Sequence, residues 1–268
     1  MGKKKKAAKK NNLNIALFFL VSFLFLIFVS LIIKLVIVLK NSKFDGDHRF
    51  TVAVSAKDNI KVISFSPQEK SISILTVDGK VNENIGKFLA VPIDDHIVSN
   101  EISISRANIT SNLLKSIIDL DKLKSKLTSI DILRLSYFTK SVPLTSIYEK
   151  KIIKDLDEYT RGVLVSSLFT DQQISTEKKR IQIINGTDIT GVGNRLATVI
   201  NNIGGDVVIV STSERKEKVS KIIYSGNKSY TVDKLSSILN FVNEKSKDTS
   251  LADVIIILGM DKISEFKY

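Results

Sequence analysis

Aspartates are the side chains of this sequence best suited to catalysis or metal binding, because it contains no cysteine and only two histidines. The lack of cysteine excludes disulfides, thiolate catalysis and cysteine-based zinc sites. His48 and His96 lie among loop-like residues, where a solvated or hydrogen-bonded role is expected. Single aspartates stand at Asp58 and Asp78, and a pair at Asp94-Asp95. Since adjacent strand residues point to opposite faces, the pair is predicted to be solvated loop residues rather than an acid and a base.

A glycine-rich turn between an expected strand and an expected helix is the second candidate site. It runs from Asn185-Gly186-Thr187 to Gly191-Val192-Gly193-Asn194-Arg195, and such turns expose backbone N–H groups that bind anions. It matches neither G-x-G-x-x-G nor G-x-x-x-x-G-K-S/T. The favoured interpretation is a tight turn, with Gly191 admitting the backbone into the helix. A ligand bound here would contact Asn185, Gly186, Thr187, Gly191 and Arg195, the last of which supplies a charge.

The net charge of +12 is concentrated at the N-terminus. Six positive charges come from Lys3–Lys6, Lys9 and Lys10, which leaves +6 for the rest of the chain. That remainder has no arginine-rich stripe and no basic run with interleaved aromatic residues. The sequence therefore does not predict a nucleic-acid-binding protein.

An apolar segment that follows these lysines predicts a transmembrane helix over residues 15–39. Ile15–Ile33 contains no charge, proline or glycine, and Leu35–Leu39 completes the span of a bilayer core. The six lysines before the segment outnumber Lys40 and Lys43 directly after it, and positively charged flanks stay in the cytoplasm. Residues 1–14 are therefore predicted to be a cytoplasmic tail that contacts anionic lipids. Nearly all of the chain after the helix is predicted to be extracytoplasmic. No small-residue cleavage site follows the segment, which favours an uncleaved anchor at the cell membrane.

The external part is predicted to hold two α/β (α+β) domains, the first over residues 44–169. Its start reads as a β-meander, because β-branched and aromatic residues cluster in three short runs separated by turns. The expected strands are 49–55, 59–66 and 71–77. Helices are expected at 109–120 and 152–169, residues 130–138 fit a helix or a strand, and residues 170–180 read as a polar linker.

The second external domain, residues 180–268, shows the clearest pattern. Expected strands at 180–184, 207–210, 219–224 and 254–258 alternate with expected helices at 192–203 and 231–242, where Val242 is predicted to face inward. The order β-α-β-β-α-β is that of a split β-α-β sandwich, with two helices on one face of a mostly antiparallel sheet.

The segment from Arg180 to Asp261 resembles the C-terminal domain of LytR-CpsA-Psr cell-envelope proteins. The resemblance rests on IQIINGTDITGVGNRLATVINNIGGDVV and on the closing VIIILGMD. It covers about eighty residues. It implies a location at the cell envelope more than a reaction, because this domain has no agreed activity.

The preceding segment more faintly resembles the LytR-CpsA-Psr catalytic domain, which transfers glycopolymers from a polyprenyl-pyrophosphate carrier onto peptidoglycan with magnesium. Asp58 matches the family aspartate, but Ala56 stands where a partner arginine is expected. Asp78 likewise lacks the family's preceding Pro-Arg. Arginines bind pyrophosphate bidentately, so their loss argues against catalysis unless Arg106 or Arg134 replaces them.

These observations predict a membrane-anchored, non-catalytic cell-envelope protein that binds a cell-wall polymer or an envelope partner and needs no cofactor. The alternative is a magnesium-dependent phosphotransferase that attaches a lipid-linked glycopolymer to peptidoglycan, with Asp58 and Asp78 around the metal.

Overall fold

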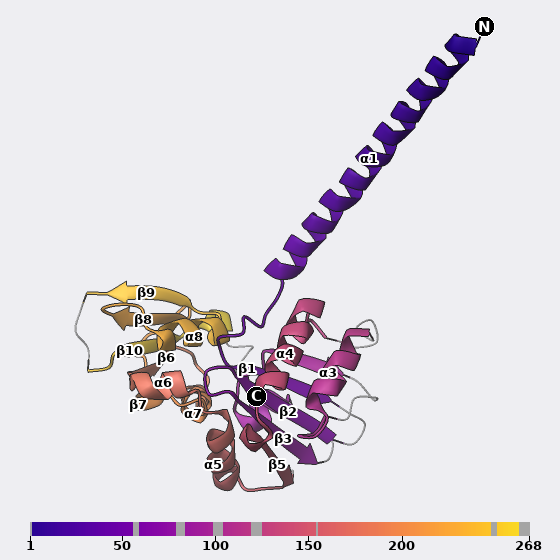
Figure 1. Ribbon diagram of the computed structural model, residues 1–268. Coiled ribbons are helices and arrows are strands. Elements are labelled where there is room, and N and C mark those ends of the chain that lie inside the picture. Colours follow the sequence, from indigo (N-terminus) through magenta and orange to yellow (C-terminus); the bar gives the residue numbers. More distant parts are fainter. Residues whose placement is uncertain are drawn as a thin grey trace.

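The computed structural model describes residues 2–55, 59–78, 84–98, 104–118, 125–153, 155–247 and 251–262. Helix α1, Gly2–Lys40, extends away from a body that contains two β-sheets (Figure 1). Residues Ile15–Lys40 are long and apolar enough to cross a membrane. The apolar side chains of this span are mostly exposed.

The first sheet has the strand order β4-β1-β2-β3-β5. The strands are β1 Phe50–Ser55, β2 Asn59–Ser66, β3 Ser71–Asp78, β4 Asp95–Val98 and β5 Ile147–Ile153. Strands β1, β2 and β3 pair antiparallel, which confirms the predicted meander. Strand β4 adds parallel to β1 and β5 parallel to β3, and the sequence pattern had not indicated either of these edge strands.

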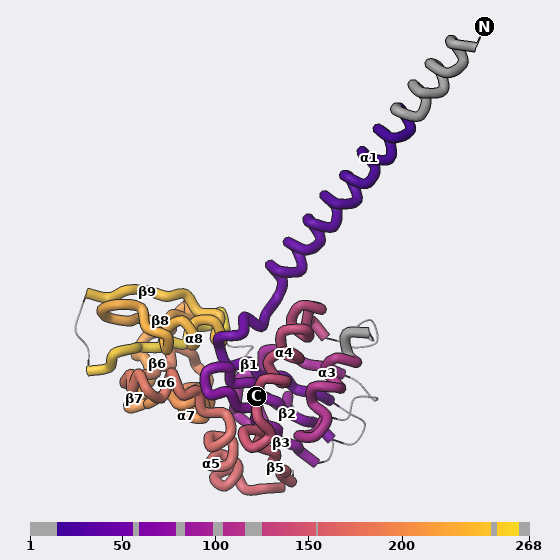
Figure 2. The backbone as a smooth tube through the Cα atoms, viewed as in Figure 1, coloured from indigo at the N-terminus to yellow at the C-terminus, as the bar shows by residue number. Residues whose placement is uncertain are grey.

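Helices cover both faces of the first sheet (Figure 2). Helices α3, Ile109–Ile118, and α4, Ser129–Ser141, pack on the face that carries Ile63 and Phe65. Helices α2, Ile85–Leu89, and α5, Glu158–Phe169, pack on the face that carries Val62. Alternate residues of β2 point to opposite faces of the sheet. Ile63 and Phe65 therefore belong to one core and Val62 to the other. The ambiguous stretch 130–138 is therefore a helix.

Two predicted boundaries around residues 152–180 are wrong. Ile152 is buried as part of β5, and the helix begins only at Glu158, where the Asp157 side chain accepts a hydrogen bond from the Thr160 N–H. The expected polar linker contains helix α6, Gln172–Glu177. This helix is mostly polar, but its Ile174 side chain is buried in the core of the second sheet.

The second sheet has the order β7-β6-β10-β8-β9. Its strands are β6 Arg180–Asn185, β7 Asp206–Thr212, β8 Lys221–Ser225, β9 Val242–Ser246 and β10 Val254–Leu258. The β-α-β-β-α-β order is present, with β9 as an additional strand. The expectation of a mostly antiparallel sheet is wrong, because only β10 and β8 pair antiparallel. Each helical crossover returns the chain in its original direction, which makes the flanking strands parallel.

Helices α7, Val192–Asn202, and α8, Tyr230–Leu239, pack on the second sheet. The prediction that the second helix reaches Val242 is wrong. Asn240 takes a left-handed conformation with φ 51° and ends α8. Val242 then starts β9 and is 64% exposed, so it does not face inward. A short 3-10 turn, Met260–Lys262, follows β10, and another, Leu144–Ser146, precedes β5.

Candidate functional site

Three adjoining cavities lie between the two sheets, beside helix α8. Asp94 lines each of them. The largest has a volume of about 580 Å³, the one nearest the end of α1 about 300 Å³, and the one between them about 20 Å³. We call them together the inter-sheet groove, defined by the residues that line two or more cavities: Arg49, Val91, Pro92, Asp94, Lys234, Ser237 and Ile238.

The largest cavity has walls from both halves of the protein. One wall is the stretch 84–96 with Glu158, and the other comes from α7 and α8. Its charged side chains are of both signs, with Lys87 and Arg195 opposed by Asp94 and Glu158. Apolar side chains, among them Val91, Ile93 and Ile238, also line it. Such a lining suits a ligand with several hydrogen-bonding groups on an extended frame rather than a simple anion.

Local capping bonds hold the first wall of this cavity in place. The Asn84 side chain accepts a hydrogen bond from the Gly86 N–H at 2.9 Å and starts α2. Ala90 ends α2 in a left-handed conformation with φ 50°. Asn202 of α7 then donates from Nδ2 to the backbone oxygens of Ala90 at 3.0 Å and Leu89 at 3.3 Å. One buried amide thus joins α7 to the end of α2.

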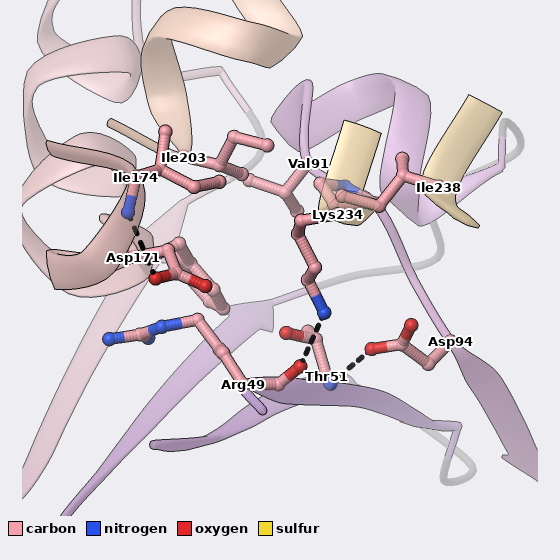
Figure 3. Close-up of a pocket in the computed structure, with 11 residues that line it drawn as sticks. Arg49, Thr51, Val91, Asp94, Asp171, Ile174, Ile203, Lys234 and Ile238 are labelled. Atoms are coloured by element: carbon pink, nitrogen blue, oxygen red, sulfur yellow. Dashed lines mark hydrogen bonds between the residues drawn. The ribbon is translucent and has the colours of Figure 1, made fainter. Parts of the chain in front are cut away.

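The central cavity contains the polar contacts drawn in Figure 3. Asp94 accepts a hydrogen bond from the Thr51 N–H at 2.7 Å, and Lys234 donates from Nζ to the Arg49 backbone oxygen at 2.8 Å. Burial raises the pKa of Asp94, and this effect outweighs the lowering by Lys234, the Thr51 N–H and Lys43. The groove therefore holds a carboxyl group that gains a proton more readily than an ordinary aspartate.

The prediction that Asp94-Asp95 are solvated loop residues is wrong for Asp95, whereas Asp94 lies in a bend directly before β4 and is partly buried. Asp95 begins β4 and is 6% exposed. Its carboxylate accepts hydrogen bonds from Ser125 Oγ at 2.8 Å and the Lys126 N–H at 3.0 Å, and pairs with Lys43 Nζ at 3.3 Å. Both aspartates hold backbone in place, a role that depends on distant segments and leaves no mark on the local sequence.

In the cavity nearest the end of α1, the His48 ring stacks on the ring of Tyr230. The ring centroids lie 5.4 Å apart with an interplanar angle of 8°. His48 also pairs with Asp45, and the Tyr230 hydroxyl donates to Asp171 Oδ2 at 2.8 Å. Burial and the bond to Asp171 raise the pKa of Tyr230, so its hydroxyl remains a donor. His96, by contrast, lies on β4 and lines the largest cavity.

The glycine-rich turn uses its polar groups internally. Asn185 Oδ1 accepts from the Thr187 N–H at 3.0 Å and from Thr187 Oγ1 at 2.7 Å, while Asn185 Nδ2 donates to the Ile189 oxygen at 2.9 Å. The Gly186 N–H donates to the Leu258 oxygen at 2.9 Å. Gly191, with φ 82°, admits the chain into α7. These contacts match the tight-turn interpretation.

Arg195 lines the largest cavity, and the Asn185, Gly186, Thr187 and Gly191 positions do not. The predicted ligand-binding set is therefore divided between a closed turn and the wall of a cavity. Glu158 and Lys87 share that cavity but were not predicted. Nothing in the local sequence marks them, because the two walls are far apart along the chain.

The alternative function predicts Asp58 and Asp78 around a metal ion. Asp58 lies outside the described residues. Asp78 ends β3, is 41% exposed and pairs with Lys151 Nζ at 2.6 Å. Asn59 lies opposite Asp78 in the register of β2 and β3. Among the residues that the structure describes, no group of three or more histidine or acidic side chains is arranged to hold a metal ion.

Of the two arginines predicted as replacements for those of the family, the structure shows side-chain contacts for Arg134 and a backbone contact for Arg106. Arg134 donates to Ser42 Oγ at 3.2 Å and to the Phe44 backbone oxygen at 2.9 Å, in the linker after α1. The backbone N–H of Arg106 donates to Glu149 Oε2 at 3.1 Å. Arg134 therefore serves the linker, whereas Asp78 has a lysine as its partner.

Comparison with known protein families finds a match for the part of the chain that forms the second sheet. Residues 178–261 match the family described as LytR cell envelope-related transcriptional attenuator. No curated protein matches the sequence.

Solved structures of bacterial proteins show a distant likeness. B. subtilis TagT is 13% identical, with a TM-score of 0.28, 41% of this chain and 81% of that chain covered. B. subtilis TagV is 10% identical, with a TM-score of 0.29 and coverages of 40% and 85%. A transcriptional regulator from Enterococcus faecalis is 12% identical, with a TM-score of 0.35 and coverages of 62% and 91%.

Proposed function

Because residues 178–261 form a LytR C-terminal domain, we propose that this chain is a membrane-anchored cell-envelope protein that binds a cell-wall polymer or an envelope partner without catalysing a reaction. The family description is itself cell envelope-related, which supports the location. The binding role is argued from the inter-sheet groove, and the anchoring role from α1.

The anchor is the apolar part of α1. Residues 15–39 span the bilayer in this proposal, residues 1–14 form a lysine-rich cytoplasmic tail, and the body lies on the far side. The distribution of lysines supports this orientation. The proposed external domains, residues 44–169 and 180–268, are supported by separate buried cores around the two sheets.

The observation that carries the binding role is the position of Arg195. It lies on a LytR C-terminal helix but lines a cavity of about 580 Å³ whose other wall is the stretch 84–96 with Glu158, from the first external domain. Neither domain forms this cavity alone. A polymer or protein segment in the cavity would contact both domains together, which gives the two-domain arrangement a function.

The proposal is tested by sedimentation of the full chain, held in detergent, with purified peptidoglycan sacculi that retain or lack their attached wall polymer. We expect Arg195→Glu to weaken retention severalfold, since it reverses a charge inside the cavity. Arg215→Glu is the matched control, because Arg215 is exposed on the loop between β7 and β8. Equal retention of the two variants, both shown to be folded by thermal unfolding, would contradict binding through this cavity.

The phosphotransferase alternative has weaker support. An arginine-rich pyrophosphate site would fit it, but Asp78 pairs with Lys151 and Arg134 contacts the linker. Full-length protein incubated with a polyprenyl-pyrophosphate glycan, magnesium and peptidoglycan decides between the two proposals by mass spectrometry of the products. Pyrophosphate cleavage that is lost in Asp58→Ala would establish catalysis, whereas binding without turnover supports the non-catalytic role.

A further inference from the structure

Helix α4 carries apolar side chains on the side that faces away from the sheet. Leu133 is 56% exposed and Tyr137 79% exposed, although Ile132 and Leu135 on the opposite side are buried. The partly buried Ile130 lies three residues before Leu133. The spacing i, i+3, i+7 places Ile130, Leu133 and Tyr137 in one stripe along the helix. We call this stripe the outer face of α4.

Basic residues flank the outer face. At about 100° per residue, Arg134 lies on one side of the stripe and Lys140 on the other, and both are exposed. Asp131 is the only carboxylate in α4, and it is buried with a relative exposure of 0%. An apolar stripe between cations, without an exposed acid, is the pattern of a helix that lies in a membrane interface.

Helix α4 is tied to the chain directly after α1. Asp131 Oδ1 accepts hydrogen bonds from Ser42 Oγ at 2.7 Å and from the N–H groups of Lys43 and Phe44 at 2.8 Å. Ser42 is two residues beyond Lys40, the last residue of α1, and two residues span at most about 7 Å. Figure 1 shows α4 beside this end of α1, and the two helices are in contact.

We propose that the outer face of α4 docks on the bilayer in which α1 is anchored, with Leu133 and Tyr137 at the headgroup boundary and Arg134 and Lys140 against anionic headgroups. This inference rests on the proposed anchoring by α1. The partner is a lipid surface because α1 would already bring it within reach of α4. Tyrosine suits this position, since its ring is apolar and its hydroxyl polar.

This contact has a mechanical consequence. One helix gives a body the freedom to tilt and rotate about the linker, but a second contact fixes its orientation. Asp131 and Arg134 both bind the linker, so docking of α4 would be transmitted directly to the first sheet. The inter-sheet groove would then be held at a constant height and direction above the bilayer.

The absence of cysteine allows a direct test. Tyr137→Cys, Tyr159→Cys and Leu24→Cys each introduce a single thiol for an environment-sensitive fluorophore. Tyr159 on α5 is 82% exposed and is the matched control for Tyr137, while Leu24 reports insertion of α1. Each full-length labelled protein is reconstituted into phosphatidylcholine vesicles with or without phosphatidylglycerol. Quenching by spin-labelled lipids is then measured.

We expect strong quenching at positions 24 and 137 and little at 159, because an interfacial helix buries its apolar face roughly 5–10 Å into the headgroup and acyl boundary. Quenching at 137 should increase with phosphatidylglycerol. A second substitution, Leu133→Asp, should lower the signal at 137 to that at 159, since it places a charge in the stripe without touching the core.

Each contrary result has a distinct meaning. Equal quenching at 137 and 159, with strong quenching at 24, would overturn the docking of α4 and leave the anchor intact. Loss of quenching at 24 would overturn the anchor as well. A signal at 137 that responds to protein density but not to spin-labelled lipid would assign the outer face of α4 to a second copy of the chain, and would also overturn the proposal.

Discussion

Lys234 Nζ donates a hydrogen bond to the backbone oxygen of Arg49 at 2.8 Å, and thereby connects helix α8 of the second sheet to the residue that precedes β1 of the first. The Arg49 guanidinium in turn donates to Ser64 Oγ at 3.0 Å and the Leu168 oxygen at 3.2 Å. One lysine and one arginine therefore link strands and helices from both halves of the chain at the centre of the inter-sheet groove.

The first prediction concerns this connection. Lys234→Met should lower the free energy of unfolding by about 1–2 kcal/mol, because a hydrogen bond from a charged group contributes about 1.5–3 kcal/mol and this lysine is only partly buried. Denaturant unfolding in detergent measures the loss. Lys216→Met is the control, since Lys216 and Asp188 form an exposed pair and exposed pairs contribute about 0–1 kcal/mol. Equal losses would show that Lys234 does not join the two halves.

The pH dependence of stability should reveal Asp94. Its pKa is raised in the folded protein by burial, so folding favours its protonated form. The stabilising contribution of this group is present below its unfolded pKa and is lost as the pH rises through the folded pKa. Compared with Asp94→Asn, the natural protein should therefore gain stability as the pH is lowered from 7 toward 4. Thermal unfolding of both proteins across this pH range measures the difference in stability. A difference that stays constant with pH would contradict the raised pKa.

Asp131 should show the opposite dependence. Burial opposes its ionisation, but hydrogen bonds from the Phe44 N–H, Ser42 and Thr128 prevail and lower the pKa of Asp131. Its stabilising contribution is present above the unfolded pKa and is lost as the pH falls through the folded pKa. Asp131→Asn should cost about 2 kcal/mol or more at pH 7, with the deficit shrinking below about pH 4. Denaturant unfolding across this pH range measures both effects, and a deficit that persists at low pH would argue against the charge.

Gly186 and Gly162 should respond oppositely to alanine. A Cβ at position 186 would lie 2.6 Å from Glu217 Cβ and 2.7 Å from the Leu258 oxygen, whereas one at position 162 would meet no atom within 4 Å. Gly186→Ala should cost about 2 kcal/mol or more through overpacking. Gly162→Ala, inside α5, should stabilise by about 0.5–1 kcal/mol. Paired denaturant curves check both signs, and tolerance of Gly186→Ala would show that its turn can move.

Sequence pattern alone was sufficient for the features that depend on neighbouring residues. The apolar run of α1, the β-meander and helix α7 each follow from composition or from a regular spacing. The tight turn at Asn185 was also predicted, and within it the Asn185 side chain accepts hydrogen bonds from Thr187, two residues away. Local periodicity misplaced the end of α8, since β9 follows after only two residues.

Tertiary structure decided everything that depends on distant segments. The sequence singled out Arg195, but only the packing of α7 against the stretch 84–96 gives it a cavity to line. The sequence predicted a solvated Asp94 and did not single out Lys234 or Asp131, because their partners lie 43, 185 and 87 residues away. Local sequence is therefore sufficient for the apolar helix α1, whereas the polar groups buried between the two sheets come together only in the tertiary structure, since hydrogen bonds across such separations leave no periodic trace in the chain.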